Sequence, residues 1–182
     1  VSYNYDSRYL ISANFRADGS SRLAPGHRWA YFPSVSAAWR ISGESWMEDV
    51  EWIDDLKLRG GWGQTGNQGG IGDYAYLERY SINRQNWWET GKEHAVPTFS
   101  QSSLRNTDLT WERTTQTNVG LDWTMLKNRL SLNFDWYYKY TTDMLMWVSL
   151  PAGSAAVSSI QRNEGEMSNM GVEFTITSHN FV

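Results

Sequence analysis

Apolar and polar residues alternate along six stretches of this 182-residue chain. A period of two places successive side chains on opposite faces of a β-strand. In residues 9–18, Ile11 and Phe15 share one face, while Asn14 and Arg16 share the other. The six stretches are residues 9–18, 33–42, 56–63, 114–123, 130–140 and 169–178. The alternation predicts a strand of about ten residues in each stretch.

The connections between these strands alternate in length. Long stretches at residues 18–29, 64–109 and 142–165 are separated by a compact connection at 43–54 and a tight turn near Lys127. Apolar residues in the compact connection have helical spacing, which predicts one or two helical turns. A β-sandwich has no reason to sort its loops in this way, whereas transmembrane barrels have short periplasmic turns and long external loops. The pattern therefore predicts an all-β, antiparallel transmembrane barrel segment.

The two ends of the chain predict further strands. Val1, Tyr3 and Tyr5 already alternate, so we expect the chain to begin inside a strand. At the other end, His179–Val182 stops where a turn into another strand is expected. Because bacterial barrels close with about eight strands or more, six strands predict a piece of a larger barrel.

Composition favours β-structure and excludes several kinds of partner. The chain contains 11 Trp, 10 Tyr and 6 Phe, which suit strands with one apolar face. A net charge of -4 without any run of Lys or Arg argues against nucleic acid. The absence of cysteine excludes disulfides and thiolate metal sites.

The run Gly61–Gly66, GWGQTG, matches the G-x-G-x-x-G pattern of dinucleotide-binding loops. That function requires a helix directly after the glycines, so that its N-terminus faces the phosphates. The following Asn67-Gln68-Gly69-Gly70 is unfavourable for a helix. The glycines are instead predicted to end a strand, where they permit a β-bulge or close approach of another chain segment.

No catalytic, metal or cofactor site is predicted, and we do not expect an enzyme. His27, His94 and His179 are isolated, and the acidic residues between 48 and 55 lack the spacing of a calcium loop. The candidate contacts for a substrate or partner are Trp87, Trp88 and Trp147 in the predicted external loops, since flat aromatic rings stack on sugars and on proteins. The alternative is that these rings pack the loops against their own bases.

Six segments resemble, in order, the SusC/RagA-type TonB-dependent transporters of the Bacteroidetes outer membrane. They are YLISANFRADGSSRL, RWAYFPSVSAAWRIS, LKLRGGWGQTGNQ, LTWERTTQTNVGLDW, NRLSLNFDWYYKYTTDML and NEGEMSNMGVEF. The resemblance implies a plugged barrel of roughly 22 strands. It also implies TonB-dependent import of oligosaccharides or peptides and a SusD-like surface lipoprotein as partner. No cofactor is implied.

The resemblance makes residues 1–182 a partial barrel domain. The plug domain, the Ton box and the C-terminal strand of such transporters are expected outside these residues, so the TonB–ExbB–ExbD complex would act through other regions. Residues expected to face lipid are Val35, Ala37, Trp39, Trp62, Leu121, Phe134 and Phe174. Residues expected to face the lumen or plug are Arg16, Arg40, Lys57, Arg59, Gln116, Asn118, Asp135 and Glu173.

A different class of protein accounts for the same alternation. In a soluble, secreted β-sandwich the apolar faces of two sheets would share one core, and exposed tryptophans would bind carbohydrate. The two hypotheses differ in whether the apolar face is covered by protein or by lipid.

Overall fold

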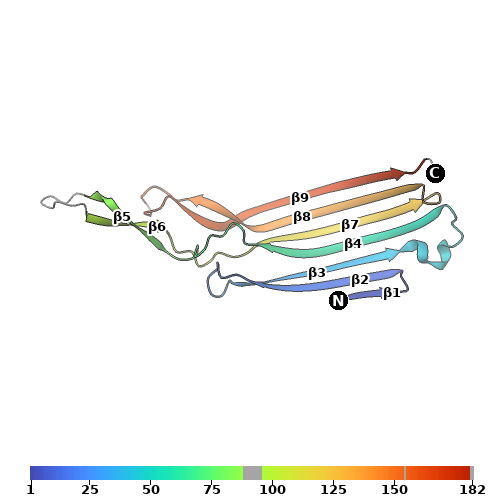
Figure 1. Ribbon diagram of the computed structural model, residues 1–182, viewed down its shortest axis with the longest axis horizontal. Coiled ribbons are helices and arrows are strands. Elements are labelled where there is room, and N and C mark those ends of the chain that lie inside the picture. The colour runs from blue at the N-terminus through green and yellow to red at the C-terminus, as the bar shows by residue number, and fades with distance from the viewer. Residues whose placement is uncertain (88–95, 154, 181–182) are drawn as a thin grey trace.

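The main element of the computed structural model is one curved antiparallel sheet of seven strands (Figure 1). The structure describes residues 1–87, 96–153 and 155–180. The strand order is β1-β2-β3-β4-β7-β8-β9, and every neighbouring pair is antiparallel. The bounds are β1 Ser2–Tyr5, β2 Tyr9–Gly19, β3 Trp29–Arg40, β4 Ile53–Asn67, β7 Glu112–Met125, β8 Leu130–Ser149 and β9 Ser159–Ser178. The predicted all-β antiparallel fold is confirmed, and the strand expected at the start of the chain is β1.

The β1–β2 turn, the β7–β8 turn and the compact connection between β3 and β4 lie at one end of the sheet, the short-turn end. Asp6 and Ser7 both have positive φ, and the Arg8 N–H donates to the Tyr5 carbonyl at 3.0 Å, which is the geometry of a type I′ hairpin turn. The compact connection contains two 3-10 turns, η1 Ile41–Gly43 and η2 Ser45–Met47, so the predicted helical turns are present. The turn from β7 to β8 passes through residues 126–128, each with positive φ.

At the opposite end of the sheet, the outer end, the connections are shorter than the sequence predicts, because the strands extend further. β8 and β9 pair from Leu130↔Ser178 to Ser149↔Ser159, so most of residues 142–165 is strand and not loop. A register shift near Asp143, which has positive φ, interrupts the alternation in the sequence without ending the ladder. The stretch 64–109 likewise contains the hairpin of β5 Arg79–Trp87 and β6 Val96–Ser103, which projects beyond the sheet (Figure 1).

The small buried core lies under the long loops at the outer end of the sheet. Its members are Leu23, Ala30, Phe32, Ile71, Leu109 and Trp111, with Ala75 and Leu145 packed against them. Along the strands, by contrast, large apolar side chains remain uncovered, including Val35, Val172 and Phe174. The β-sandwich hypothesis requires a second sheet packed against this apolar face. In the described part of the chain no second sheet covers it. No helix of the described residues is long and apolar enough to cross a membrane.

Candidate functional site

The register gives the sheet one polar and one apolar face. One row across the strands contains Asn14, Ser34, Gly63, Gln116, Lys139 and Asn169. The adjacent row, whose side chains point the other way, contains Ala13, Val35, Trp62, Thr117, Tyr138 and Met170. The eight residues predicted to face a lumen share the polar face, and the seven predicted to face lipid share the apolar one.

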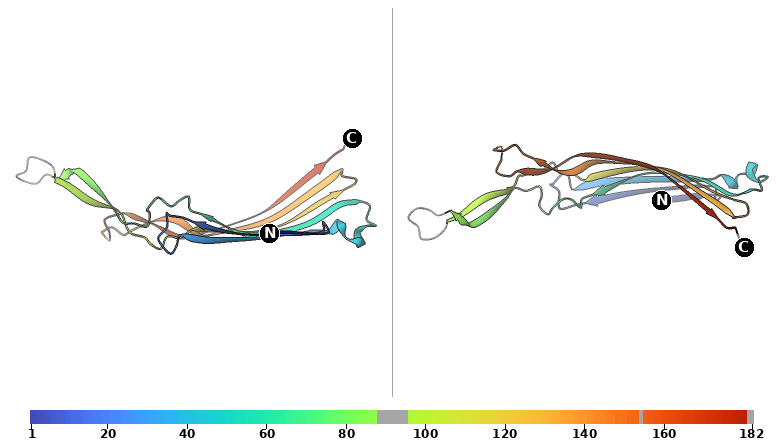
Figure 2. Two further views of the ribbon diagram at one scale, coloured as in Figure 1. Left: turned by 60° about the horizontal axis from the view of Figure 1, so that its bottom comes forward. Right: turned by 90° about the horizontal axis from the view of Figure 1, so that it is seen from above.

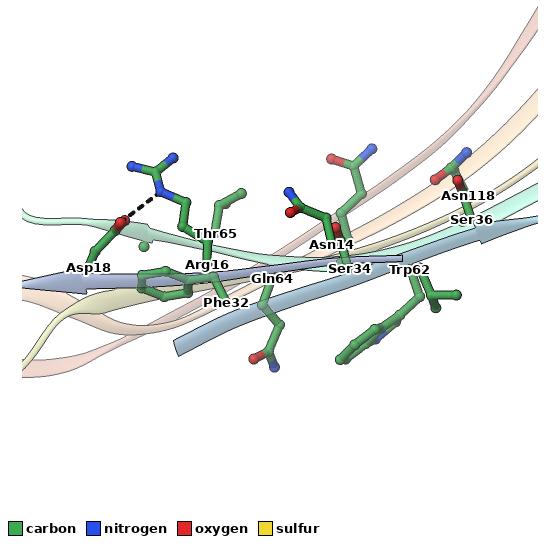
Figure 3. A pocket seen from close by; sticks show the side chains of 15 residues that line it. Asn14, Arg16, Asp18, Phe32, Ser34, Ser36, Trp62, Gln64, Thr65 and Asn118 are labelled. Carbon is green, nitrogen blue, oxygen red and sulfur yellow. Dashed lines mark hydrogen bonds and ion pairs between the residues drawn. The ribbon is translucent and has the colours of Figure 1, made fainter. Parts of the chain in front are cut away.

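The polar face is the concave one. The sheet is bowed along its length, as Figure 2 shows. In Figure 3 the side chains of Asn14, Arg16 and Asn118 point toward the side to which the far strands rise, while Trp62 and Gln64 point away from it. The sheet therefore has a concave polar face and a convex apolar face.

A hollow of about 410 Å³ lies at this face, where the pairing of β3 with β4 ends at Ser34↔Gly63. Its polar lining comes from four strands, so that residues far apart in the sequence meet there (Figure 3). The polar-face side chains that line it are those of Asn14, Arg16, Asp18, Ser34, Ser36, Thr65, Gln116 and Asn118, and the lining also includes Val35, Trp62 and Gln64 from the other face.

Two glycines of the GWGQTG run leave space in this hollow that larger side chains would fill. A β-carbon at Gly61 would lie 2.8 Å from Asn118 Oδ1, and one at Gly63 would lie 2.8 Å from Ser34 Cβ. The predicted close approach is therefore confirmed. The alternative of a bulge is wrong, because the pairing with β7 is regular from Asp55 to Asn67. The run continues as strand to Asn67 with no helix after it, which excludes a dinucleotide loop.

Four charged side chains form a cluster on the polar face, nearer the short turns. The Arg59 guanidinium donates to Asp122 at 3.2 Å and to Asp135 Oδ2 at 2.6 Å. Lys57 Nζ lies 3.6 Å from Asp122 Oδ2. Each carboxylate thus faces a cation, which offsets the cost of removing the charges from water.

Gly120 makes this cluster possible. It lies between Arg59 and Asp135 in the register, and a β-carbon there would be 2.6 Å from Asp135 Oδ1 and 2.7 Å from Arg59 Cζ. The alternation in the sequence places Arg59 and Asp135 on one face but does not predict their pairing. The available signal was a glycine at a polar-face position of a strand.

Other predicted polar-face residues pair locally. Arg40 and Ser42 both donate to Asp55 Oδ1 at 2.7 Å, and Arg16 Nε donates to Asp18 at 2.7 Å. These contacts join β3 to β4 and hold Arg16 along its own strand.

At the short-turn end, Glu44 joins the connection between β3 and β4 to the apolar face. Tyr9 Oη and Trp39 Nε1 donate to Glu44 Oε1 at 2.5 and 3.0 Å, and Arg8 Nη1 lies 3.5 Å from Oε2. The hydrogen bond from Tyr9, followed by that from Trp39, lowers the pKa of the Glu44 carboxyl. The Tyr9 and Trp39 rings stack at 6.4 Å.

The remaining candidates lie at the outer end. Trp147 lies within β8 and is 71% exposed, so the prediction that it belongs to a loop is wrong. Only the backbone of Trp87 is described, at the end of β5, and Trp88 lies outside the described residues, as does His94. Within the described ranges, no group of His, Asp or Glu is arranged to hold a metal ion.

Comparison with known proteins covers the whole sheet. The sequence model of the family "TonB dependent receptor-like, beta-barrel" matches residues 1–181. TonB-dependent receptor SusC of Bacteroides thetaiotaomicron is 37% identical over 178 residues, which are 98% of this chain and 18% of SusC. TonB-dependent receptor P39 of Formosa agariphila is also 37% identical, over 98% of this chain and 16% of its own length. The chain therefore spans less than a fifth of these relatives.

Solved structures give the same result. The RagAB peptide importer in its "closed-closed" state superposes with a TM-score of 0.84 at 32% identity, covering 100% of this chain and 19% of the matched chain. The siderophore receptor PirA of Pseudomonas aeruginosa shares the fold, with a TM-score of 0.57 at 12% identity over 95% of this chain and 29% of PirA.

Proposed function

The chain belongs to the TonB-dependent receptor β-barrel family, in its SusC/RagA branch of outer-membrane proteins, and on this premise we propose that it forms part of the wall and outer rim of a nutrient importer. The proposed cargo is an oligosaccharide or a peptide, taken up through a barrel that residues 1–182 share with further strands. We assign the chain no catalytic role.

The contrast between the two faces of the sheet is the observation that carries this proposal. An apolar convex face suits contact with lipid, and a polar concave face suits a water-filled or plugged lumen. Phe174, Val172 and Ile176 expose about 60% of their surface on the apolar side, which is costly in water and favourable against acyl chains. We therefore assign the lumen to the polar face that carries Arg59 and Asn118.

The proposed partners follow from the same assignment. A SusD-like surface lipoprotein would contact the outer rim, which contains the long loops and the β5–β6 hairpin. The TonB–ExbB–ExbD complex would act through a plug and Ton box outside these residues. Outer-membrane lipid would surround the apolar face.

Uptake by the full-length protein tests the proposal. Asn14→Trp places a large ring in the polar hollow, and Ala13→Trp places the same ring on the apolar face one residue away. We expect Asn14→Trp to slow the TonB-dependent uptake of one oligosaccharide or peptide class in the native host, with Ala13→Trp close to wild type at equal surface abundance. Uptake of every class unchanged after deletion of the gene would contradict the proposal.

A further inference from the structure

A second hollow lies at the outer end of the sheet and shares no lining residue with the hollow described above. Its volume is about 490 Å³, within the range of pockets that hold small ligands, about 300–1,000 Å³. One wall comes from the segments on either side of the β5–β6 hairpin, and the other comes from the outer parts of β8 and β9. Residues from both walls that matter for its chemistry are Gly70, Arg79, Asn106, Trp147 and Gln161.

Hydrogen bonds hold the two walls together. Gln161 Nε2 donates to the Gly70 carbonyl at 2.8 Å, and Asn106 Nδ2 donates to the Gln161 carbonyl at 2.6 Å. The Asn163 side chain accepts from the Thr110 N–H at 2.9 Å and donates to the Thr110 carbonyl at 3.0 Å. The hollow is therefore formed before any ligand arrives, which lowers the entropic cost of binding.

The floor of this hollow rests on the buried core. Leu109 lines the hollow and is 1% exposed, and Ile71 beside it in the core is also 1% exposed. Gly72 lies at the opening, where a β-carbon would meet nothing within 4 Å. A ligand that enters past Gly72 would therefore meet a floor supported by the buried core.

Three groups in the hollow have bonding capacity that the described residues do not use. The Trp147 ring is 71% exposed, and its indole N–H has no hydrogen-bond partner among the described residues. The Arg79 guanidinium forms no ion pair or hydrogen bond with any residue of the described ranges. Gln161 uses its amide nitrogen for Gly70, which leaves its side-chain oxygen as an acceptor.

We propose that this hollow is a sugar-binding subsite, in which a pyranose ring of an oligosaccharide stacks on Trp147 and its hydroxyls bond with Arg79 and Gln161. The inference rests on the proposed import function and names the substrate class. A pyranose has an apolar C–H face for the indole and hydroxyls that both donate and accept, which matches the groups left open. A peptide strand would need a row of free backbone groups, but those of β8 and β9 here are used in their ladder.

The test uses the full-length transporter, purified in detergent. It is equilibrated with a pool of oligosaccharides of four to ten residues, made by partial hydrolysis of α-glucan, β-glucan, mannan, xylan and galactan. Bound sugars are identified by mass spectrometry, and a tryptic casein digest serves as the peptide pool. The variants are Trp147→Ala and Trp147→Tyr, with Trp46→Ala as the matched control, because Trp46 is 61% exposed in the short-turn connection at the opposite end.

We expect wild type and Trp46→Ala to retain the same oligosaccharides, Trp147→Ala to bind them at least tenfold more weakly, and Trp147→Tyr to recover most of the affinity. Capture of peptides but no sugars, capture of neither, or equal sugar binding by Trp147→Ala would overturn the subsite. TonB-dependent uptake measured in cells with the same variants separates this failure from a failure of the proposed import function.

Discussion

The ring of Phe32 lies over Gly66, in the space that a β-carbon at that position would need. Phe32 is 4% exposed and meets Trp111 edge-to-face at 5.9 Å. Its ring therefore connects the outer end of β4 to the core under the long loops. The last glycine of the GWGQTG run is thus required by packing.

Gly66→Ala should destabilise the outer end of the sheet. The buried Phe32 ring would have to move, and overpacking of this kind costs about 1–3 kcal/mol. Thermal unfolding of the full-length protein and limited proteolysis of the long loops measure the effect. Gly72→Ala is the matched control, since its β-carbon meets nothing within 4 Å. Equal behaviour of the two variants would show that the Phe32 contact does not matter.

The pair Arg59–Asp135 should contribute more to stability than an exposed ion pair. Both side chains are about 30% exposed, and Asp122 completes the cluster. A double-mutant cycle with Arg59→Met and Asp135→Ala should give a coupling energy of about 1 kcal/mol. The half-exposed pair Arg162–Glu164 serves as the comparison and should give about 0.2 kcal/mol. A coupling energy for Arg59–Asp135 no larger than that of Arg162–Glu164 would contradict the prediction that the cluster stabilises the protein more than an exposed ion pair.

Glu44 should make stability depend on pH on the acid side. Its pKa is lowered from 4.5 in the folded protein, so its stabilising effect is present above that pH and is lost as the pH falls through the folded value. Glu44→Gln should therefore unfold more easily than wild type at pH 7, with the difference shrinking below about pH 4.5. Denaturant unfolding from pH 3 to 7 measures this.

Glu48→Gln is the control for the Glu44 experiment, because it removes an exposed carboxylate from the same connection. A difference between wild type and Glu44→Gln that stays constant from pH 3 to 7 would mean that the hydrogen bonds from Tyr9 and Trp39 do not depend on the charge.

Most of the sheet could be predicted from the sequence because each strand has one apolar face and one polar face. Alternation such as that around Asn118 and Val119 fixes both the strand and its facing. The outer parts of β8 and β9 could not be predicted, because the irregularity near Asp143 shifts the phase of the pattern. The β5–β6 hairpin does not show in the pattern because four polar residues follow Ile82 in β5 and four follow Phe99 in β6, which ends the alternation.

The sites were harder to predict than the strands. Arg59 and Asp135 are 76 positions apart in the sequence, and their pairing depends on the register between strands. The alternation within one strand carries no information about that register. The outer hollow depends on Asn106 and Gln161, whose hydrogen bonds join β9 to segments distant in the sequence. The exposed tryptophan Trp147 was the one member of that hollow that the sequence singled out.

The facing of the sheet is the central claim, and arginine substitution on adjacent residues tests it most directly. Val119 lies on the apolar face and is 43% exposed, while Asn118 lines the polar hollow. In the full-length protein, Val119→Arg should cost about 2–4 kcal/mol and reduce assembly in the outer membrane, because it places a cation against lipid. Asn118→Arg should assemble as wild type. Equal assembly of the two variants, measured by heat-modifiable migration and surface labelling, would contradict the account.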